Sequence, residues 1–580
     1  MLTSYIDIKS HLTALFTEAV KQVAAETTDI AIEMERPRDA AHGDYACSVA
    51  MKLAKPLRRN PRELATLIQA ALPASDLVAK TEIAGAGFIN VYLQPQAHQQ
   101  VVSHILGLGA DYGRNQLGAG KKVQVEFVSA NPTGPLHVGH GRGAAYGASL
   151  ANVLAAAGYT VAREYYVNDA GRQMDILAIS AWLRYLALCG ESVSFPANAY
   201  QGDYVITMAQ TVFELHANRY QRPIAEVTAQ VPDYEQAPDA YLDQLIANAK
   251  ALLGADYHYV HDFVLTEQLG DGRNDLHEFG VEFDEYFSEQ SLYDSGVVQR
   301  TIAQMEANGH IYTQDGAKWF RSTHFGDEKD RVVLRENGQY TYFASDIAYH
   351  INKLERGFDW MIDVWGADHH GYIPRVKGAL QALNLDPDKL TVALVQFAVL
   401  YRDGQKAAMS TRSGEFVTLR DLRHEVGNDA ARFFYVLRKS DQHLDFDLDL
   451  AKSQTSDNPV YYIQYAHARI CSVLAQWGGD TAALTSMDCS VLTSRYELDL
   501  LQCLAEYPGV IEMAARDLAP HVIAYALKDV AAALHTYYNA EQFLVEDVTM
   551  KHARLALITA TREVLRSGLT LLGVSSPAQM

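Results

Sequence analysis

Long hydrophobic runs, paired cysteines and an excess of basic residues are all absent from this 580-residue sequence. A membrane helix needs a run of about 18 apolar residues, and none occurs. The N-terminus, MLTSYIDIKSHLTALFTEAVKQV, lacks the basic stretch followed by an apolar stretch that marks a secretion signal. The five cysteines include no CxxC pair, which argues against a structural zinc site and a disulfide framework. We therefore expect a cytoplasmic protein with no membrane segment and no structural metal.

The charge balance is acidic, with a formal net charge of −21. A protein that binds nucleic acid without specificity normally shows a basic footprint, so the composition disfavours that class. A local basic patch on an acidic body is still compatible with it. Hydrophobic residues make up 48% of the chain and charged residues 21%, which is ordinary for a globular protein.

Changes of pattern divide the chain into four regions. Residues 1–112 predict a small α+β domain, because helical segments are followed by a Gly-rich turn and the alternating strand FINVYL. Residues 113–380 predict an α/β domain, which an acidic, Tyr-rich helical insertion interrupts at about 195–290. Residues 381–455 connect it to an all-α region, 456–580, where every long segment has helical periodicity.

The α/β region opens with a βαβ unit. KVQVEFV, residues 122–128, predicts a strand, and HVGHGRGAAYGASLANVLAAAGY predicts a helix of small residues that ends at Gly158. VAREYYVND predicts the next strand. Such a unit implies a parallel, Rossmann-like sheet. QYTYFASDIAYHINKLE and DWMIDVWGADHHG, further along, are also typical of sheet.

The turn SANPTGPLHVGHGRG lies between that strand and that helix, where free backbone N–H groups and the helix dipole favour an anion. Gly139 and Gly141 permit close approach of a ligand to the backbone. His137 and His140 can donate hydrogen bonds to phosphate oxygens or add positive charge. A zinc site would need a third ligand, which the turn does not offer, and a purely structural turn is the other alternative. The pattern favours a site for nucleotide phosphate.

Known families share these motifs. PLHVGH resembles the HIGH signature of class I aminoacyl-tRNA synthetases, and FVSANPTGPLHVGHGR followed by YYVNDAGRQ resembles the bacterial type of the arginyl-tRNA synthetase family. AHGDYACSVAMKLAK and AGAGFINVYL look like that family's additional N-terminal domain, GADHHGYIPRVKGAL like its second nucleotide-contacting loop, and AMSTRSGEFVTLRDL like its KMSKS loop. NPVYYIQYAHARICSVL and TREVLRSGLTLLGVSSPAQM resemble its anticodon-binding helices.

The resemblance implies a Rossmann-like catalytic domain, an α+β N-terminal domain that contacts tRNA, and an all-α anticodon-binding domain. It also implies two substrate sites. Catalysis would use His137, His140, Lys406, Met409, Ser410 and Arg412. The HIGH motif would comprise Asn131, Pro132, Thr133, Gly134, Pro135, Leu136, His137, Val138, Gly139, His140 and Gly141. ATP would bind to His137, Gly139, His140, Gly366, Asp368 and His369, and arginine to Glu126, Ser129, Asn131, Tyr342, Asp346 and His370.

A guanidinium pairs with a carboxylate in a planar, bidentate way when the geometry allows. Tyr342 and Asp346 are four residues apart, so both side chains point the same way if TYFASD is helical. The resemblance assigns Asp346 to the guanidinium, although the residues alone also fit a surface Asp beside a core Tyr. Glu126 also allows an alternative, a salt bridge with Lys121 or Lys122.

The second signature of the family, the KMSKS loop, is matched only in part. In RDGQKAAMSTRSG, Met409 and Ser410 match the KMSKS pattern, but Ala408 and Thr411 occupy the two lysine positions. Lysines there neutralise the departing pyrophosphate, so a missing cation weakens the stabilisation of the transition state unless another replaces it. A solvated loop role for Lys406 is the alternative to catalysis. The candidates for a replacement charge are Lys406, Arg412 and Arg142.

The implied reaction has two steps. The arginine carboxylate attacks the α-phosphate of ATP, with Mg²⁺ bridging the phosphates, and pyrophosphate leaves. The terminal ribose hydroxyl of tRNA(Arg) then attacks the acyl carbon and AMP leaves. The resemblance further implies that tRNA must be bound before arginine is activated, and we expect a monomer.

The RNA face must be local, because residues 455–580 contain eight basic and thirteen acidic residues and are net −5. Unpaired bases stack on aromatic side chains, although tyrosines in these helices fit a core equally well. Candidates for the RNA face are Arg469, Lys528, Lys551, Arg554, Arg562, Arg566, Tyr537 and Tyr538.

Two rival functions fit part of the pattern. A glutamyl or cysteinyl synthetase shares the HIGH signature, but Asp346 favours a cationic substrate and the scattered cysteines offer no zinc site. A catalytically silent tRNA-binding paralogue would explain the eroded KMSKS loop, but it leaves the two histidines and the arginine pocket unexplained.

Overall fold

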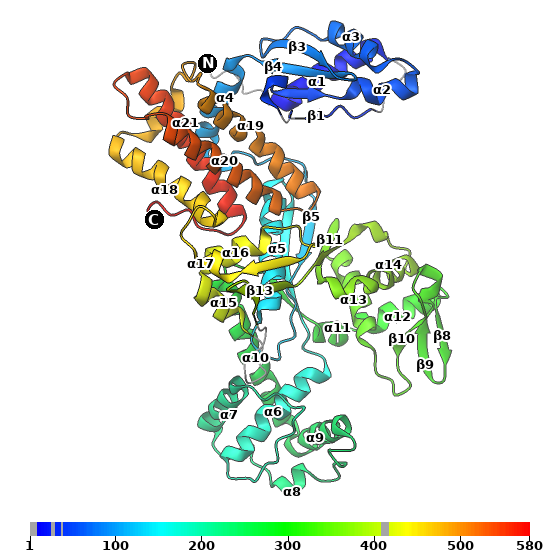
Figure 1. The fold of residues 1–580 in the computed structure, drawn as a ribbon. Helices are drawn as coiled ribbons and strands as arrows, with labels where there is room; N and C mark the ends of the chain where they lie inside the picture. Colours follow the sequence, from blue (N-terminus) through cyan, green and yellow to red (C-terminus); the bar gives the residue numbers. More distant parts are fainter. Residues whose placement is uncertain (1–7, 25–29, 36, 38, 408–416) are drawn as a thin grey trace.

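The computed structural model describes residues 8–24, 30–35, 37, 39–407 and 417–580. Figure 1 shows an elongated molecule, with the N-terminal domain at one end, a helical body at the other and a parallel sheet between them. The C-terminal helices pack between the sheet and the N-terminal domain. In these described ranges, no helix is both long and apolar enough to span a membrane.

The centre of the fold is a five-stranded parallel sheet with the order β12-β11-β5-β6-β7. The chain runs from β5 through β6 to β7 at one edge and returns to β11 on the other side of β5, so the order reverses between β5 and β11. Ligands of open α/β sheets bind at the carboxyl ends of the strands beside such a point. The predicted Rossmann-like sheet is confirmed. Its strands are β5 (Lys122–Glu126), β6 (Thr160–Val167), β7 (Glu285–Ser288), β11 (Trp360–Gly366) and β12 (Leu390–Val395).

Helix α5 (Val138–Ala156) follows β5, as the βαβ pattern predicts, and ends two residues before Gly158. Its small residues are needed for close packing. A Cβ atom on Gly147 would lie 2.3 Å from Cγ of Phe127, and one on Gly141 would lie 2.7 Å from Cε2 of Tyr435. The buried Tyr435 also donates a hydrogen bond of 2.9 Å to the carbonyl of Val138, which fixes the first turn of α5.

The segment QYTYFASDIAYHINKLE is a helix, α13 (Tyr342–Glu355), so its prediction as sheet is wrong. Several of its residues favour strands, but helical periodicity outweighs that preference. Phe343 and Ile347 lie four residues apart, on one face of the helix, and both are buried. The following segment, DWMIDVWG, forms β11 as predicted. Between β11 and α14 (Ile373–Ala382), the stretch ADHHGY forms a 3₁₀ turn, Ala367–Tyr372.

Five helices between β6 and β7 form a body with its own hydrophobic core. The predicted range of this insertion, 195–290, begins too late and ends too late, because the first of these helices precedes it and β7 lies within it. The helices are α6 (Arg172–Leu188), α7 (Asp203–His216), α8 (Ile224–Val227), α9 (Pro238–Leu253) and α10 (Ala255–Glu278).

The N-terminal domain is α+β, as predicted, with an antiparallel sheet of order β1-β2-β4-β3. Helix α4 (Pro95–Leu108) leads away from it toward the C-terminal helices, and just beyond α4 the Tyr112 hydroxyl donates a hydrogen bond of 2.7 Å to the Leu504 carbonyl. The other elements are α1 (Ile8–Val23), β1 (Met34–Glu35), β2 (Tyr45–Cys47), α2 (Val49–Leu57), α3 (Pro61–Ala71), β3 (Val78–Ala84) and β4 (Phe88–Leu93).

Two three-stranded sheets flank the main sheet. One is antiparallel and contains β8 (Ile311–Gln314), β9 (Ala317–Phe320) and β10 (Arg331–Leu334), near α11 (Gln290–Asp294) and α12 (Val297–Ala307). In the other, β13 (Ala398–Arg402) pairs antiparallel with β14 (Gln405–Lys406) and parallel with β15 (Leu444–Asp447). The helices of this connecting region are α15 (Leu419–Val426), α16 (Asn428–Val436) and α17 (Leu448–Lys452).

The C-terminal region is all-α, as predicted. Glu497, in the first turn of α19, is buried and accepts hydrogen bonds of 3.1 Å from both Arg554 and Tyr537. These two residues belong to the core of the helical domain, so the prediction that they face RNA is wrong. The long helices are α18 (Pro459–Trp477), α19 (Arg495–Arg516), α20 (His521–Ala540) and α21 (Val548–Leu571).

Replacing glycines of α5 should test how closely that helix packs. We expect Gly147→Ala to lower the apparent melting temperature, because its new Cβ overlaps Phe127 and overpacking costs about 1–3 kcal/mol. Gly143→Ala is the matched control on the same helix, where a Cβ meets no atom within 4 Å. It should raise the melting temperature slightly, because alanine favours helix over glycine by about 1 kcal/mol. Thermal unfolding of both variants checks the contrast, which equal shifts in both would contradict.

Candidate active site

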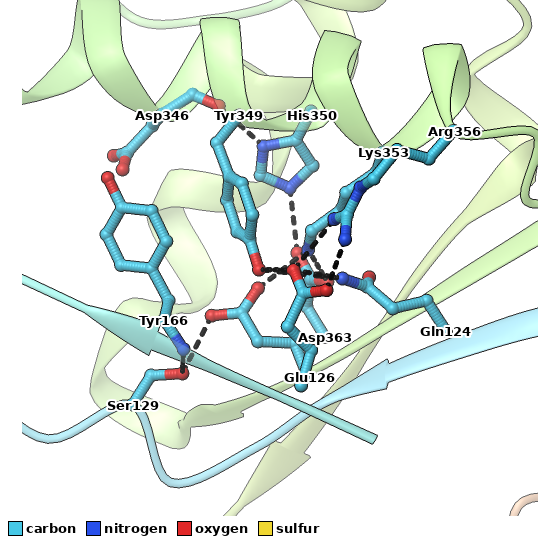
Figure 2. Close-up of polar contacts among 11 residues, drawn as sticks. Gln124, Glu126, Ser129, Tyr166, Asp346, Tyr349, His350, Lys353, Arg356 and Asp363 are labelled. Atoms are coloured by element: carbon cyan, nitrogen blue, oxygen red, sulfur yellow. Dashed lines mark hydrogen bonds and ion pairs between the residues drawn. The ribbon is translucent and has the colours of Figure 1, made fainter. Parts of the chain in front are cut away.

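A buried ion cluster lies at the switch point of the sheet (Figure 2). Glu126 ends β5 and is the register partner of Asp363 in β11. Lys353 reaches down from α13 and places its Nζ 2.6 Å from Oε2 of Glu126 and 2.7 Å from Oδ1 of Asp363. The side chains of Lys353 and Asp363 are completely buried. The alternative pairing of Glu126 with Lys121 or Lys122 is therefore wrong.

His350, one turn before Lys353, completes this cluster. Its Nε2 lies 2.8 Å from Oδ2 of Asp363, and its Nδ1 lies 2.7 Å from the carbonyl of Asp346. A carbonyl can only accept, so Nδ1 carries the hydrogen of that bond. Burial alone would raise the pKa of the Asp363 carboxyl, but Lys353 and His350 outweigh burial and hold this pKa well below its usual value.

A second ion pair lies beside the first and is complete in itself. Arg356 donates two hydrogen bonds to the buried Glu164, of 2.6 and 2.8 Å, and one of 2.9 Å to Glu285. Gln124 donates a further bond of 2.7 Å to Glu164, and the Tyr349 hydroxyl donates to the same carboxylate. The negative charge of Glu164 is thus matched within the protein.

Two other carboxylates in this region have no cation beside them among the described residues. Asp346 accepts a hydrogen bond from the Tyr372 hydroxyl, and burial raises its pKa. Glu289, directly after β7, accepts one of 2.7 Å from Ser345, but its buried Oε2 accepts none. Burial raises the pKa of Glu289 to about 7. Two carboxylates without a paired cation, one buried and one partly covered, are unfavourable by themselves and are suited to a cationic ligand.

The turn after β5 is strained. Val128 and Ser129 have φ angles of 69° and 41°, which β-branched valine in particular rarely adopts, and the Ser129 amide donates 3.0 Å back to the Phe127 carbonyl. Ser129 Oγ donates 2.9 Å to Oε1 of Glu126 and accepts 3.1 Å from the Tyr166 amide. Such conformations cost about 1–3 kcal/mol each and persist only where the surroundings hold them.

His137 and His140 form the N-terminus of α5. Nδ1 of His137 accepts 3.1 Å from the Gly139 amide, and Nδ1 of His140 accepts 3.2 Å from the His137 amide, so each ring carries its hydrogen on Nε2. The rings stack with centroids 3.7 Å apart. Burial lowers the pKa of His140 to about 3 and also lowers that of His137. Both are neutral donors, so the alternative that they add positive charge is disfavoured.

The rest of the HIGH loop is held by packing. Pro132, Leu136 and Val138 are buried, and the Thr133 carbonyl accepts 2.6 Å from the Tyr204 hydroxyl. Thr133, Gly134 and Pro135 are half-buried, and Asn131 is exposed. Gly139 must lack a side chain, because a Cβ there would lie 2.8 Å from the His137 ring.

The second predicted nucleotide loop follows β11, the neighbour of β5. Gly366 ends the strand, and the Asp368 carboxylate folds back over it, 2.5 Å from where a Cβ would stand. Asp368, His369 and His370 are all exposed. Tyr342, the first residue of α13, is 53% exposed, whereas Asp346 one helical turn later is partly covered.

Arg142 cannot replace the missing lysines. It is buried, and its guanidinium donates to the carbonyls of Gln396, Lys439 and Gln442 at 2.8, 2.9 and 2.7 Å. The prediction that Arg142 supplies charge to phosphate is therefore wrong, and its role is to brace α5. Lys406 is exposed on β14. Met409, Ser410 and Arg412 lie outside the described residues.

Three residues of this region are absent from the predictions. Glu289 was not predicted as a site residue because the predicted insertion, 195–290, included both it and β7. Its place directly after a strand could have indicated a ligand-binding role. Lys353 lay in a segment interpreted as sheet. Phe397 is 51% exposed and its Cδ1 lies 3.4 Å from the Cβ position of Gly139, so an aromatic face stands beside the HIGH loop.

The domains match known family models. Residues 101–191 and 259–451 match the model described as "tRNA synthetases class I (R), catalytic domain". Residues 10–93 match "Arginyl tRNA synthetase N terminal domain", and residues 463–580 match "DALR anticodon binding domain". Together with the HIGH loop at the switch point of a parallel sheet, these matches define a class I aminoacyl-tRNA synthetase.

The chain belongs to the arginyl-tRNA synthetase family. It is 66% identical over 587 residues to the arginine–tRNA ligase of Azoarcus sp., covering 99% of this chain and 100% of that one. It is 63% identical to the arginine–tRNA ligase of Nitrosospira multiformis, covering 99% of both chains. The arginyl-tRNA synthetase structure from Thermus thermophilus shares the fold, with a TM-score of 0.76 and 22% identity over 99% of this chain and 100% of that chain. The rival glutamyl and cysteinyl families are excluded by this membership.

Binding of arginine should depend on pH through Glu289. Below its raised pKa of about 7 the carboxyl is protonated, and that proton must leave before a guanidinium can pair with it. We expect the dissociation constant of arginine to rise as pH falls from 8 to 6, approaching about tenfold per unit at the acid end. Calorimetric titrations at several pH values measure this dependence.

Glu289→Gln should weaken binding at every pH and flatten this dependence. Glu282→Gln, an exposed carboxylate paired with His277, is the matched control and should keep the wild-type slope. A wild-type affinity that stays constant between pH 6 and 8 would contradict the assignment.

Proposed function

We propose that this chain joins arginine to tRNA in an ATP-dependent reaction, and that the residues described above divide between the two small substrates. The observation that carries the proposal is the uncompensated pair Asp346 and Glu289 at the same sheet edge as the α5 N-terminus. One site suits a guanidinium and the other suits phosphate, as arginine activation requires. Family membership supports arginine, ATP and tRNA as the partners.

The arginine site is built around α13 and the ends of β5 and β7. Asp346 and Glu289 pair with the guanidinium, and Tyr342 covers it from the first turn of α13. Figure 2 shows the Tyr166 hydroxyl pointing toward Asp346, so this tyrosine forms one wall of the proposed arginine site. Ser129 and Asn131, on the strained turn and the HIGH loop, hold the α-amino and carboxylate groups, and His370 borders the opening.

The ATP site lies over the N-terminus of α5. The Nε2–H groups of His137 and His140 donate to phosphate oxygens, and Gly139 lets the nucleotide approach the backbone. Gly366, Asp368 and His369 contact the ribose and adenine from the neighbouring loop. Mg²⁺ held by the phosphates of ATP would neutralise part of their charge. The described residues include no group of three or more His, Cys, Asp or Glu that could hold a metal ion.

The protein contributes position and charge to both chemical steps. In the first, a carboxylate oxygen of arginine forms a bond to the α-phosphorus of ATP as the bond to pyrophosphate breaks. In the second, a ribose hydroxyl of tRNA bonds to the acyl carbon, loses its proton, and AMP leaves. Neutral histidine donors stabilise the phosphate oxygens without needing to change their own protonation.

The charge on departing pyrophosphate requires a cation. Lys406 is the described candidate, because it is exposed on β14 immediately before the KMSKS-like loop that carries Met409, Ser410 and Arg412. No ion pair joins Lys406 to another described residue, so its charge is available. Arg412 is the second candidate.

Transfer RNA contacts the C-terminal helical domain and the N-terminal domain in this proposal. In the helical domain, the Arg469 guanidinium lies between the rings of Tyr465 and Tyr538, 4.6 Å from each centroid. This stack is partly exposed and suits an unpaired base. Arg562 and Arg566 both pair with Glu563, which reduces their charge toward RNA, and Lys528 remains exposed. On the N-terminal domain, a cluster of exposed cations at the α2–α3 junction suits the RNA backbone: Lys55, Arg58, Arg59 and Arg62.

The proposal includes a cytoplasmic location, because the aminoacylated tRNA is consumed where ribosomes translate. It also includes a monomeric state. The single chain carries both substrate sites and both RNA-binding domains, so no second copy is required to complete them. Light scattering should give the mass of one chain, 64.2 kDa.

Exchange of labelled pyrophosphate into ATP tests the function directly. We expect exchange to require arginine and bound tRNA together, and neither lysine nor glutamate should replace arginine. Omission of tRNA should abolish the signal, as the family resemblance implies. Complete absence of exchange with all components present would support the silent tRNA-binding paralogue.

Lys406→Ala should slow the exchange about 10- to 100-fold, because one cation facing the departing pyrophosphate is lost. The Michaelis constant for arginine should not change. Arg402→Ala is the matched control on the same hairpin, since its guanidinium is already paired with Glu425 at 2.7 Å. An unchanged rate in Lys406→Ala would transfer this role to Arg412.

A further inference from the structure

We propose that Lys353 is a positioning residue that sets both ends of the arginine pocket from beneath it. The inference rests on the proposed function and goes beyond it, because Lys353 touches no substrate. Its ammonium lies where two chains of hydrogen bonds meet (Figure 2). One chain leads through Glu126 to Ser129, and the other leads through Asp363 and His350 to the backbone of Asp346.

The first chain holds the strained turn. Oε2 of Glu126 accepts from Lys353 at 2.6 Å, and Oε1 accepts from Ser129 Oγ at 2.9 Å. Both carboxylate oxygens are therefore occupied by protein donors. Glu126 is better placed to brace Ser129 than to contact arginine directly, which changes the role that the resemblance implied for it. Ser129 in turn accepts from the Tyr166 amide, so the turn is held from two strands.

The second chain holds the first turns of α13. Asp363 accepts from Lys353 at 2.7 Å, and its other oxygen lies 2.8 Å from Nε2 of His350. Nδ1 of His350 donates to the carbonyl of Asp346, the residue that faces the guanidinium. Lys353 thus connects the turn that holds the main-chain end of arginine to the helical turn that holds its side-chain end.

The charge of Lys353 is what this arrangement needs. Without it, Glu126 and Asp363 would be two buried carboxylates on adjacent strands in register, and no shared cation would offset their repulsion. Glu126 would move away from Asp363, and the oxygen to which Ser129 Oγ donates would move with it. The strained turn would then lose the contact that holds it.

Lys353→Met tests this with a side chain of similar length and no charge. In tRNA-dependent pyrophosphate exchange, we expect the Michaelis constant for arginine to rise about 10- to 100-fold, because misplacement of a binding group by about 1 Å can have such an effect. The Michaelis constant for ATP should stay within about twofold, since the histidines lie outside both chains. A Michaelis constant for arginine within about twofold of the wild-type value would overturn the proposal.

Arg356→Met is the matched control, because Arg356 is the next cation along the chain, directly after α13, and pairs with Glu164 instead of Glu126 or Asp363. It should lower the melting temperature but leave the arginine constant within about twofold of wild type. A rise equal to that in Lys353→Met would show a general response to losing a cation in this region, and it would overturn the specific role of Lys353.

The double variant Lys353→Met, Glu126→Gln distinguishes an effect of the lost charge from an effect of altered side-chain packing. Glutamine keeps an oxygen that accepts from Ser129 and removes the surplus negative charge. We expect the double variant to recover most of the affinity lost in Lys353→Met, and Glu126→Gln alone to have a small effect. Losses of arginine affinity that add up in the double variant would overturn the proposal, and the double variant still decides it if Lys353→Met fails to fold. Exchange by the wild-type protein is measured first, so failure of the proposed function can be told apart from failure of this proposal.

Discussion

Lys353 carries a charge into the buried interior, between two carboxylates at the carboxyl ends of adjacent strands. Sheet topology creates this place, because β5 and β11 become neighbours only where the strand order reverses. Acidic side chains are concentrated at the carboxyl ends of these strands, where ligands of open α/β sheets bind. The fold can bury Glu126 and Asp363 together only because a cation from α13 reaches both.

The distribution of charge around this cluster explains how one edge of a sheet can serve two substrates of opposite charge. Glu126, Asp363 and Glu164 are matched by protein cations, and Asp346 and Glu289 are left without one. In the proposed assignment, that imbalance lies on the arginine side. On the proposed nucleotide side, burial keeps His137 and His140 neutral, so hydrogen-bond donors and the helix N-terminus favour phosphate without adding a cation that would repel the guanidinium.

The acidic composition and an RNA partner are compatible for a similar reason. The overall charge of −21 describes the whole surface, whereas binding depends on groups that no internal carboxylate has already matched. Arg554 is buried in an ion pair with Glu497, and Arg562 and Arg566 both pair with Glu563. Arg469 instead lies between two tyrosine rings and forms no ion pair with a described carboxylate, so its charge is not already matched.

Local patterns in the sequence were enough to predict the βαβ unit, a Gly-rich turn at the start of α5 and the helical C-terminal domain. Each depends on residues a few positions apart, which strand alternation, glycine content or helical spacing reveals. The choice of Asp346 as the carboxylate for a guanidinium came instead from the family resemblance, since the residues alone also fit a surface Asp. The sequence failed at α13 and β7, where burial against the rest of the fold outweighed local preference. Only the tertiary structure decided that Glu126 pairs with Lys353, 227 residues away, that Glu289 contacts Ser345, the neighbour of Asp346, and that the Arg142 guanidinium is bound by backbone carbonyls. Pairing of buried charges depends on strand order and helix placement, and no pattern along the chain records which distant side chains will meet.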